Sequence, residues 1–352
     1  MNKDRRGVVK KWFVAPALLV ALAAASLGGA ANAKNKPPAK AFDPTCGPAR
    51  TATRTVNGTL GSVTLRGTPT RIIALEFSFV DDLVQVGVTP VGIADDNDPT
   101  RIIPPVRAKL GQYTSVGLRQ TPNLETIASL HPDLIIADAS RHVNIYHQLQ
   151  AIAPTIALDS LQEAYLPNLH AAIVVGQAVN KCGAMVRRVQ QDKIIMQRMK
   201  AAVMAATHGK GETRRTMFVV DTNKIWNVHS NLAYTPSLLQ AIGIPPANTL
   251  PYTKDNIGNP YIVMSQEDLL SNNPDIIFVA NNPPNPIFDK WSQSPLWGQI
   301  NAVKNKQVYV VNANLWSKAR GLAAGELIAQ QAVHLLYHKY VSIKLPNVSG
   351  TT

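Results

Sequence analysis

The chain has 352 residues, of which 45% are hydrophobic and 16% charged, and this composition excludes an intrinsically disordered protein. Its length is sufficient for two domains with separate hydrophobic cores. The formal net charge of +13 at pH 7 favours anionic partners, whereas the lack of a motif that interleaves basic and aromatic residues argues against nucleic acid.

Residues 1–33 have the three-part pattern of a secretory signal peptide: a basic start, an apolar run from Trp12 to Ala25, and an Ala31-Asn32-Ala33 cleavage site. An uncleaved membrane anchor is the alternative, but the small residues after the apolar run argue against it. Arg5-Arg6 leaves export by either the general or the twin-arginine route open. Removing the +4 carried by this segment from the total of +13 leaves a mature chain near +9.

Residues 34–53 are rich in Lys, Pro and Ala and are predicted to form a flexible arm. The only two cysteines, Cys46 and Cys182, are 136 positions apart, so the spacing of a metal site is absent. An oxidising compartment would allow a disulfide between them. Two lone thiols remain the alternative.

Residues 54–165 are predicted to form an N-terminal α/β lobe. A hairpin is expected at 56–65, where the pattern alternates around two glycines. Further along, a helix is predicted at 79–86 and buried strands at 71–75, 91–94, 115–117 and 134–137. Strands that alternate with helices imply right-handed crossovers and a parallel sheet.

Residues 166–210 are predicted to form a connecting helical segment. From Met185 to Ala206 there is no Gly or Pro, apolar residues recur at helical spacing, and basic residues fill the other face. At 1.5 Å per residue this is one helix of roughly 30 Å. A basic amphipathic helix could lie on a membrane surface, but its place between two lobes favours a connecting spine.

Residues 211–345 are predicted to form a C-terminal α/β lobe. The expected strands are 216–220, 276–280 and 308–311, and residues 323–340 are expected to form a closing helix. Residues 238–245 repeat the helix-Gly-apolar-Pro pattern of residues 83–90, which supports an internal duplication.

The strongest internal repeat relates residues 124–137 to residues 266–279, which lie 142 positions later. In each copy an acidic residue, Glu125 or Glu267, opens a short helix that ends at Pro-Asp, and a continuous apolar run follows. A helix that leads into a buried strand, twice at long range, predicts two similar lobes and a ligand-binding cleft. Each glutamate could simply stabilise its helix start. The matched pair instead favours a docking site for basic residues of a partner.

Ligands of doubly wound sheets bind beyond the carboxyl ends of the strands. Three arginines, Arg119, Arg141 and Arg320, fall on such strand-end loops and are predicted to face one cleft. Because guanidinium groups bind carboxylates at two points, they suit a ligand with several carboxylates. Solvated surface arginines are the alternative. Glu76 and Ser140 lie on the same class of loop and are further candidate contacts.

Trp316 lies in a second-lobe loop that is polar on average, so its indole is expected to face the ligand. Tyr165, at the start of the connecting segment, is a weaker candidate for the same role. His142 and His147 are five positions apart, which suits neither one helical face nor a zinc pair, and each is expected to cap a helix or lie on the surface. Asp95-Asp96 is expected to serve a turn.

Motifs for an enzyme are absent from the sequence, including G-x-S-x-G, G-x-x-x-x-G-K-[ST], H-E-x-x-H, C-x-x-C and G-x-G-x-x-G. We therefore expect no catalytic residues, no bound metal and no cofactor. An exported α/β enzyme that acts on an anionic substrate is the rival interpretation from another functional class.

Several stretches resemble the periplasmic substrate-binding proteins of iron–siderophore ABC importers: residues 91–98, 115–119, 132–142, 295–297 and 314–321. The resemblance covers nearly all of residues 68–340 and implies two Rossmann-like lobes joined by a single long helix, with modest opening and closing. Lys318 departs from the pattern, where Arg is expected. Lys supplies a point charge in place of a two-pronged donor.

The resemblance implies that a monomer in the periplasm captures an anionic ferric chelate, with iron(III) dicitrate as the expected ligand. It implies that the protein holds the iron through the carboxylates of the ligand. It also implies that Glu125 and Glu267 pair with arginines of an inner-membrane permease. Another siderophore, haem or cobalamin is the alternative ligand, but these would favour a more aromatic cleft, and only 6% of this chain is aromatic.

Overall fold

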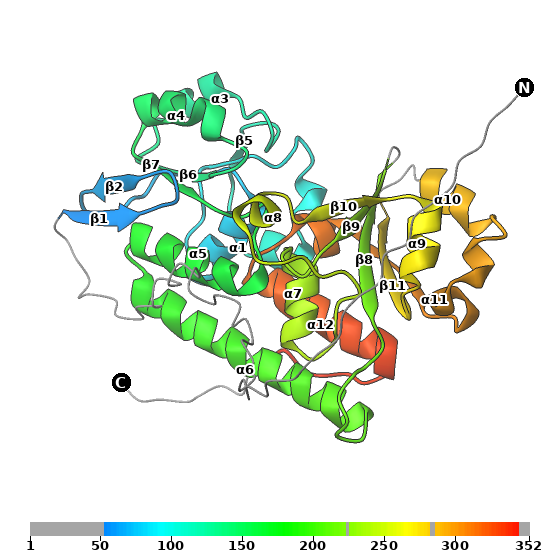
Figure 1. The fold of residues 1–352 in the computed structure, drawn as a ribbon. Coiled ribbons are helices and arrows are strands. Elements are labelled where there is room, and N and C mark those ends of the chain that lie inside the picture. Colours follow the sequence, from blue (N-terminus) through cyan, green and yellow to red (C-terminus); the bar gives the residue numbers. More distant parts are fainter. Residues whose placement is uncertain (1–52, 223–224, 282–285, 345–352) are drawn as a thin grey trace, which may run out of the picture. The chain divides into compact units, whose positions relative to one another are not determined.

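The computed structural model describes residues 53–222, 225–281 and 286–344, which belong to one compact unit (Figure 1). The predicted signal peptide, Cys46 and all but the last residue of the predicted arm lie outside the described residues. The described part begins with a hairpin of two short strands, β1 (Arg54–Asn57) and β2 (Ser62–Leu65). The remaining strands form two five-stranded sheets.

The first sheet has the order β5-β4-β3-β6-β7, and all of its neighbouring strands are parallel, as the alternating pattern predicts. Its strands are β3 (Ile72–Ala74), β4 (Gly92–Ile93), β5 (Thr114–Ser115), β6 (Leu134–Asp138) and β7 (Thr155–Leu158). Its helices are α1 (Phe77–Gln85), η1 (Pro99–Arg101), α2 (Pro104–Arg107), α3 (Leu124–Ser129), η2 (Val143–Ile145) and α4 (Tyr146–Ile152).

The second sheet has the order β10-β9-β8-β11-β12 and is mixed. Its strands are β8 (Thr216–Asp221), β9 (Trp226–His229), β10 (Tyr261–Met264), β11 (Ile276–Asn281) and β12 (Val308–Asn312). Strands β9 and β10 are antiparallel to their neighbours and were not predicted. The link from β8 to β9 is too short for a crossover helix, so the chain turns straight back.

The helices around the second sheet are mostly short. They are α7 (Tyr234–Ala241), α8 (Lys254–Gly258), α9 (Gln266–Asn272), α10 (Pro286–Ser292), η3 (Trp297–Gln299), α11 (Asn301–Lys304) and the π-helical turn η4 (Asn314–Lys318). The closing helix α12 (Leu322–Tyr337) ends three residues earlier than predicted, because His338 adopts a left-handed conformation with φ 54°.

The two lobes are connected by α5 (Tyr165–Ala178) and by the long helix α6 (Cys182–Ala206), which is green in Figure 1. The helix predicted at 185–206 lies wholly within α6, and α5 precedes it. Gly176 allows α5 and α6 to pack closely, because a Cβ atom there would lie 2.5 Å from Cβ of Met185. Cys182, the first residue of α6, is part of a disulfide bond.

Three hydrophobic clusters form the core. One continuous cluster contains residues from α1, α5, α6, α7 and α12 and from both sheets. A second cluster joins the first sheet to α3 and α4, and a third joins the second sheet to α9, η3 and α11. Each sheet is therefore covered by short helices on one face and by the shared helical core on the other, as expected for buried strands.

The internal repeat is confirmed as two copies of a helix followed by a strand next to the central strand of its sheet, α3–β6 and α9–β11. Each copy is also joined to the start of a neighbouring strand by the same pair of polar contacts, which we call a staple. The Asp133 carboxylate accepts a hydrogen bond from the main-chain nitrogen of Arg71 (2.8 Å), and Asp275 accepts one from that of Arg215 (2.9 Å). The Arg71 side chain also donates to the carbonyl of Leu130 at the end of α3, and the Arg215 side chain donates to that of Asn272 at the end of α9. These staples lie at the amino ends of β3 and β8.

Candidate functional site

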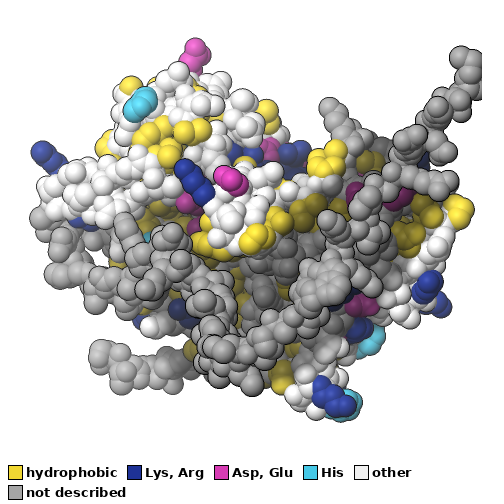
Figure 2. All heavy atoms as spheres, in the orientation of Figure 1, with side chains coloured by type: hydrophobic (Ala, Val, Ile, Leu, Met, Phe, Trp, Pro, Cys, Tyr) yellow, Lys and Arg dark blue, Asp and Glu magenta, His cyan; other side chains and the backbone are white. Residues whose placement is uncertain are grey.

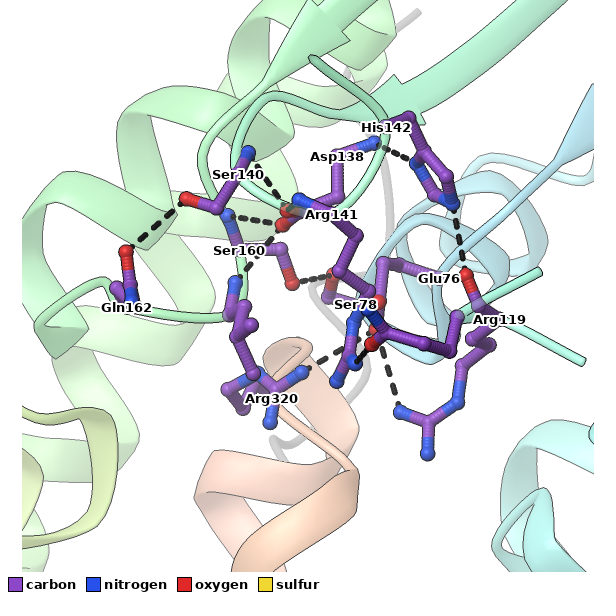
Figure 3. Close-up of polar contacts among 12 residues, drawn as sticks. Glu76, Ser78, Arg119, Asp138, Ser140, Arg141, His142, Ser160, Gln162 and Arg320 are labelled. Carbon is purple, nitrogen blue, oxygen red and sulfur yellow. Dashed lines mark hydrogen bonds and ion pairs between the residues drawn. The ribbon is translucent and has the colours of Figure 1, made fainter. Parts of the chain in front are cut away.

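A single buried carboxylate, Glu76, lies at the centre of the predicted arginine cluster (Figure 3). Its Oε2 atom is 3.3 Å from Nη1 of Arg119 and 3.2 Å from Nη2 of Arg320. Its Oε1 atom forms an ion pair with Nε of Arg141. The structure therefore brings together all three arginines, two from the first lobe and one from the second.

Strand geometry explains why these side chains meet. Glu76 follows β3, Arg119 follows β5 and Arg141 follows β6, and the carboxyl ends of parallel strands lie at one edge of a sheet. Arg320 arrives from the second lobe, in the short link between η4 and α12. The structure brings the three arginines together, and their contact with a ligand remains a prediction.

The cluster contains more guanidinium groups than carboxylates. Burial alone would raise the pKa of Glu76, but the guanidinium groups of Arg119, Arg141 and Arg320 outweigh it and hold the pKa below its usual range. Glu76 is therefore ionised. Glu76 and Asp96, which also pairs with Arg119, supply two negative charges against three guanidinium groups, so the cluster keeps an excess of positive charge.

Arg119 is held in place by Asp96. The carboxylate accepts hydrogen bonds from Nη2 (2.8 Å), Nε (3.1 Å) and the main-chain nitrogen (2.9 Å) of Arg119. The guanidinium also lies 4.0 Å from the ring centre of Phe77. Asp96 and Asn97 both have positive φ, 62° and 57°, which places this strain directly beside the cluster. Sequence reasoning assigned Asp96 only to a turn.

Asp138 and His142 organise the loop that carries Arg141 (Figure 3). Oδ1 of Asp138 accepts hydrogen bonds from the main-chain nitrogens of Ser140 (2.9 Å) and Arg141 (2.7 Å). The side chain of Ser140 binds Gln162 at 3.2 Å. His142 is completely buried and its side chain does not cap η2, so the expectation of a capping or surface role is wrong for it, whereas His147 is exposed.

Contacts with both lobes hold Arg320 and the residue that follows it. The Arg320 guanidinium donates to the carbonyl of Ser317 at 2.9 Å as well as pairing with Glu76. The following residue, Gly321, packs directly on Asp81 of α1: a Cβ atom at Gly321 would lie 2.4 Å from Oδ2 of Asp81. Tyr261, on β10, adds a second contact across the lobes by donating to the carbonyl of Leu161 at 2.7 Å.

Trp316 does not face the site. Its side chain is 0% exposed, packs against Phe218 and Phe278, and donates from Nε1 to Gln331 at 2.8 Å. The expectation of a ligand-facing indole is therefore not met. The π-helical turn η4 directs the indole into the core. The polarity of the segment comes from the residues next to Trp316.

Tyr165 is also buried, and its hydroxyl donates to Asp192 of α6 inside the helical core, so it does not line the arginine cluster. Lys318 is closer to the cluster. Burial and the neighbouring charges of Arg101 and Arg119 lower the pKa of Lys318, and its ammonium group binds Asn314 at 2.9 Å. Lys318 therefore adds a positive charge near Arg119.

Glu125 and Glu267 are exposed in the first turns of α3 and α9. Figure 2 shows an acidic side chain that projects from the surface over α3. Other side chains cap these helices: Asn123 accepts from Thr126, and Ser265 forms a capping box with Asp268. Capping therefore does not explain either glutamate.

Within residues 53–222, 225–281 and 286–344, no helix has the length and apolar character needed to cross a bilayer. In the same residues, no group of three or more His, Cys, Asp or Glu side chains is arranged to hold a metal ion.

Two α/β lobes joined by a long helix, with cationic side chains from both lobes meeting at their strand ends, define a two-lobed ligand-binding protein. Residues 68–315 match the family model of periplasmic binding proteins. The chain belongs to this family, whose members bind and deliver substrates, and the expectation of a binding protein in place of an enzyme agrees with it.

Two curated relatives are similar over most of the chain. The Fe(3+) dicitrate-binding periplasmic protein FecB of Escherichia coli is 40% identical over 289 residues, which are 82% of this chain and 92% of that protein. The Fe(3+)-citrate-binding protein YfmC of Bacillus subtilis is 37% identical over 286 residues, covering 81% and 87%.

Solved structures share the fold. Staphylococcus aureus SirA complexed with staphyloferrin B has a TM-score of 0.70 at 23% identity, covering 81% of this chain and 98% of that chain. FeuA of Bacillus subtilis complexed with ferri-bacillibactin has a TM-score of 0.67 at 17% identity, covering 81% and 98%. The fold expectation of two Rossmann-like lobes joined by a long helix is therefore confirmed.

Proposed function

We propose that this protein captures an anionic ferric chelate, iron(III) dicitrate, outside the cytoplasm and delivers it to an ABC permease of the inner membrane. The observation that supports this proposal is the convergence of Arg119, Arg141 and Arg320 on one buried carboxylate. The two citrate-binding relatives support the identity of the chelate. The basic start of the chain supports export through a cleavable signal peptide.

The ligand carboxylates take the place that Glu76 occupies in this structure, or share the arginines with it. Each guanidinium has five N–H donors, and one carboxylate engages only part of them. Because Arg320 belongs to the second lobe, a ligand held by all three arginines bridges both lobes. Citrate groups bound to iron present several carboxylates at once, and this suits a cluster with more positive than negative charge.

A binding titration tests the ligand. Isothermal calorimetry with ferric citrate, iron-free citrate and a panel of siderophores is expected to give tight binding of ferric citrate by the wild-type protein. Arg119→Ala, Arg141→Ala and Arg320→Ala should each weaken it, and Arg66→Ala, on an exposed strand end, should not. Strong binding of another chelate beside no response to ferric citrate would overturn the assignment.

Glu125 and Glu267 form the docking site for the permease in this proposal. Both are exposed, both occupy equivalent positions of the repeat, and neither caps its helix. One acidic group on each lobe gives the permease a way to recognise the two lobes together. Basic residues of the permease are the expected partners, because opposite charges at a docking surface favour encounter and register.

A further inference from the structure

His142 connects the two loops that carry Arg119 and Arg141. It lies at the end of the β6 loop and is completely buried. Its Nδ1 atom is 2.9 Å from the main-chain nitrogen of Asp138, and its Nε2 atom is 2.8 Å from the carbonyl oxygen of Arg119, 23 residues away in sequence. Both ring nitrogens are thus used, and one of them reaches the main chain of a site arginine (Figure 3).

These partners define the protonation state of the ring. A main-chain N–H can only donate, so Nδ1 accepts from Asp138, and the proton must be on Nε2 to donate to the Arg119 carbonyl. The neutral imidazole satisfies both contacts. A doubly protonated ring would set an N–H against the amide of Asp138 and would lose that hydrogen bond.

We propose that His142 is a positioning residue for anion binding: its neutral imidazole fixes the spacing between Arg119 and Arg141 by tying the Arg119 main chain to the Arg141 loop. The inference rests on the proposed function, because it concerns the same arginines. Asp138 completes the arrangement. Its Oδ2 accepts from the main-chain nitrogens of Ser160 (3.0 Å) and Leu161 (2.9 Å), which joins a third loop to the same carboxylate.

The charged groups around His142 set the pH at which this arrangement is lost. Burial lowers the pKa of His142 below 6.5, the Arg119 carbonyl, Glu76 and Asp138 act in the opposite direction, and Arg141 adds to the lowering. The imidazole therefore stays neutral at neutral pH. Protonation and loss of the Asp138 contact occur only as the pH falls below the ordinary range for histidine.

Two substitutions by amide side chains separate the two ring contacts, because each amide replaces only one of the ring nitrogens. His142→Gln keeps an N–H at the position of Nε2 and can still donate to Arg119, whereas His142→Asn keeps an acceptor at the position of Nδ1 and loses the Arg119 contact. We expect His142→Asn to bind ferric citrate roughly tenfold more weakly, or worse, because a buried carbonyl loses its donor. His142→Gln should retain most of the affinity. His147→Gln, on an exposed histidine, is the matched control.

Calorimetry between pH 5 and pH 8, with thermal unfolding of each variant, provides the readouts. Wild-type affinity should decline more steeply in acid than that of His142→Gln, because protonation sets an N–H of the imidazolium against the Asp138 amide, a repulsion that the uncharged glutamine does not have. Both proteins share the same ligand chemistry and the same Glu76, so other effects of pH should be equal. If both substitutions weaken ferric citrate binding equally, and in proportion to their loss of stability, His142 has only a structural role. That result would overturn the inference. Wild-type affinity in His142→Asn would overturn it as well.

A measurement without ligand separates this inference from the proposed function. Nitrogen-15 NMR of the free protein should show His142 protonated at Nε2 and unprotonated at Nδ1 at pH 7. The opposite tautomer would contradict the inference even if ferric citrate binds. If wild-type protein binds no ferric citrate but the tautomer is as expected, the proposed ligand is wrong and the link between the two loops stands.

Discussion

Asp81 caps helix α12 from the opposite lobe: its Oδ2 atom accepts a hydrogen bond from the main-chain nitrogen of Ala324 at 3.1 Å. The helix provides no side-chain cap of its own, because its N-cap residue is Gly321. A carboxylate at a helix N-terminus also interacts favourably with the helix dipole. The start of α12, and with it the neighbouring Arg320, is therefore placed by the first lobe.

Gly321→Ala should disturb this arrangement. The new Cβ atom would lie 2.4 Å from both Cβ and Oδ2 of Asp81, so one lobe must move against the other. We expect a loss of about 1–3 kcal/mol in unfolding free energy and weaker ferric citrate binding, as measured by urea unfolding and calorimetry. Gly298→Ala has open space around its Cβ and should be nearly neutral. Equal effects of the two changes would contradict the interpretation that Asp81 of the first lobe positions the start of α12.

Glu76→Gln should lower the stability of the protein and increase the stabilisation that added anions provide. Removing one partner from a buried ion-pair cluster leaves three guanidinium groups without their shared counter-charge, at a cost of about 3–5 kcal/mol. Multivalent anions such as citrate should then raise the thermal midpoint of the variant more than that of wild type. The measurement is thermal unfolding with and without citrate, and an identical response in both proteins would show that ligand and Glu76 do not compete.

Asp192→Asn should change the pH dependence of stability. Burial raises the pKa of Asp192 to about 7, and the charges of Glu326 and Asp81 add to the rise while Tyr165 and Arg188 oppose it. Because the folded protein holds this proton more tightly than the unfolded chain does, the contribution of Asp192 to stability is largest in acid and declines as the pH rises from about 4 toward about 7. The asparagine cannot ionise and should lack this part of the decline.

Unfolding in urea between pH 4 and pH 8.5 checks the Asp192 prediction. The variant should exceed wild type in stability at pH 8 and approach it at pH 5. Glu267→Gln, on an exposed carboxylate, should run parallel to wild type. Parallel curves for Asp192→Asn and wild type would show that Asp192 ionises at its ordinary pH.

Reversing both acidic groups of the repeat tests the docking site. Glu125→Arg combined with Glu267→Arg should abolish uptake of labelled ferric citrate by cells that carry the permease, because basic residues would then face basic residues. Affinity for the chelate should stay at the wild-type level. Asp255→Arg changes another exposed acid in a first helical turn and is the control. Uptake that survives the double change would leave the two glutamates as ordinary surface residues.

The sequence predicted the parts of the site that follow from local pattern. Parallel strands bring their carboxyl ends to one edge, so the positions of Arg119 and Arg141 could be inferred once the strands had been recognised. Arg320 was found by the same reasoning in the second lobe. The long helix α6 was readable because an uninterrupted helical period continues over many residues.

Other features depend on contacts between distant segments and could not be inferred in this way. The burial of His142 requires the Arg119 loop to fold over it, and the cap on α12 comes from Asp81, 243 positions earlier. Trp316 was misjudged because the average polarity of its segment does not tell which side of a π-helical turn faces the core. The antiparallel pairing of β9 was missed because the short link to it was not recognised as a turn.

The staples Arg71–Asp133 and Arg215–Asp275 lie at the amino ends of the strands, whereas the arginine cluster lies at the carboxyl ends. The staple contacts within each lobe are thus separated from the arginines that we propose bind the ligand. Under the proposed function, substitutions in the strand-end loops would therefore change the anion that is bound while both copies of the staple stay intact. Such a division makes the scaffold easy to diversify, since a new specificity need not be acquired at the expense of folding.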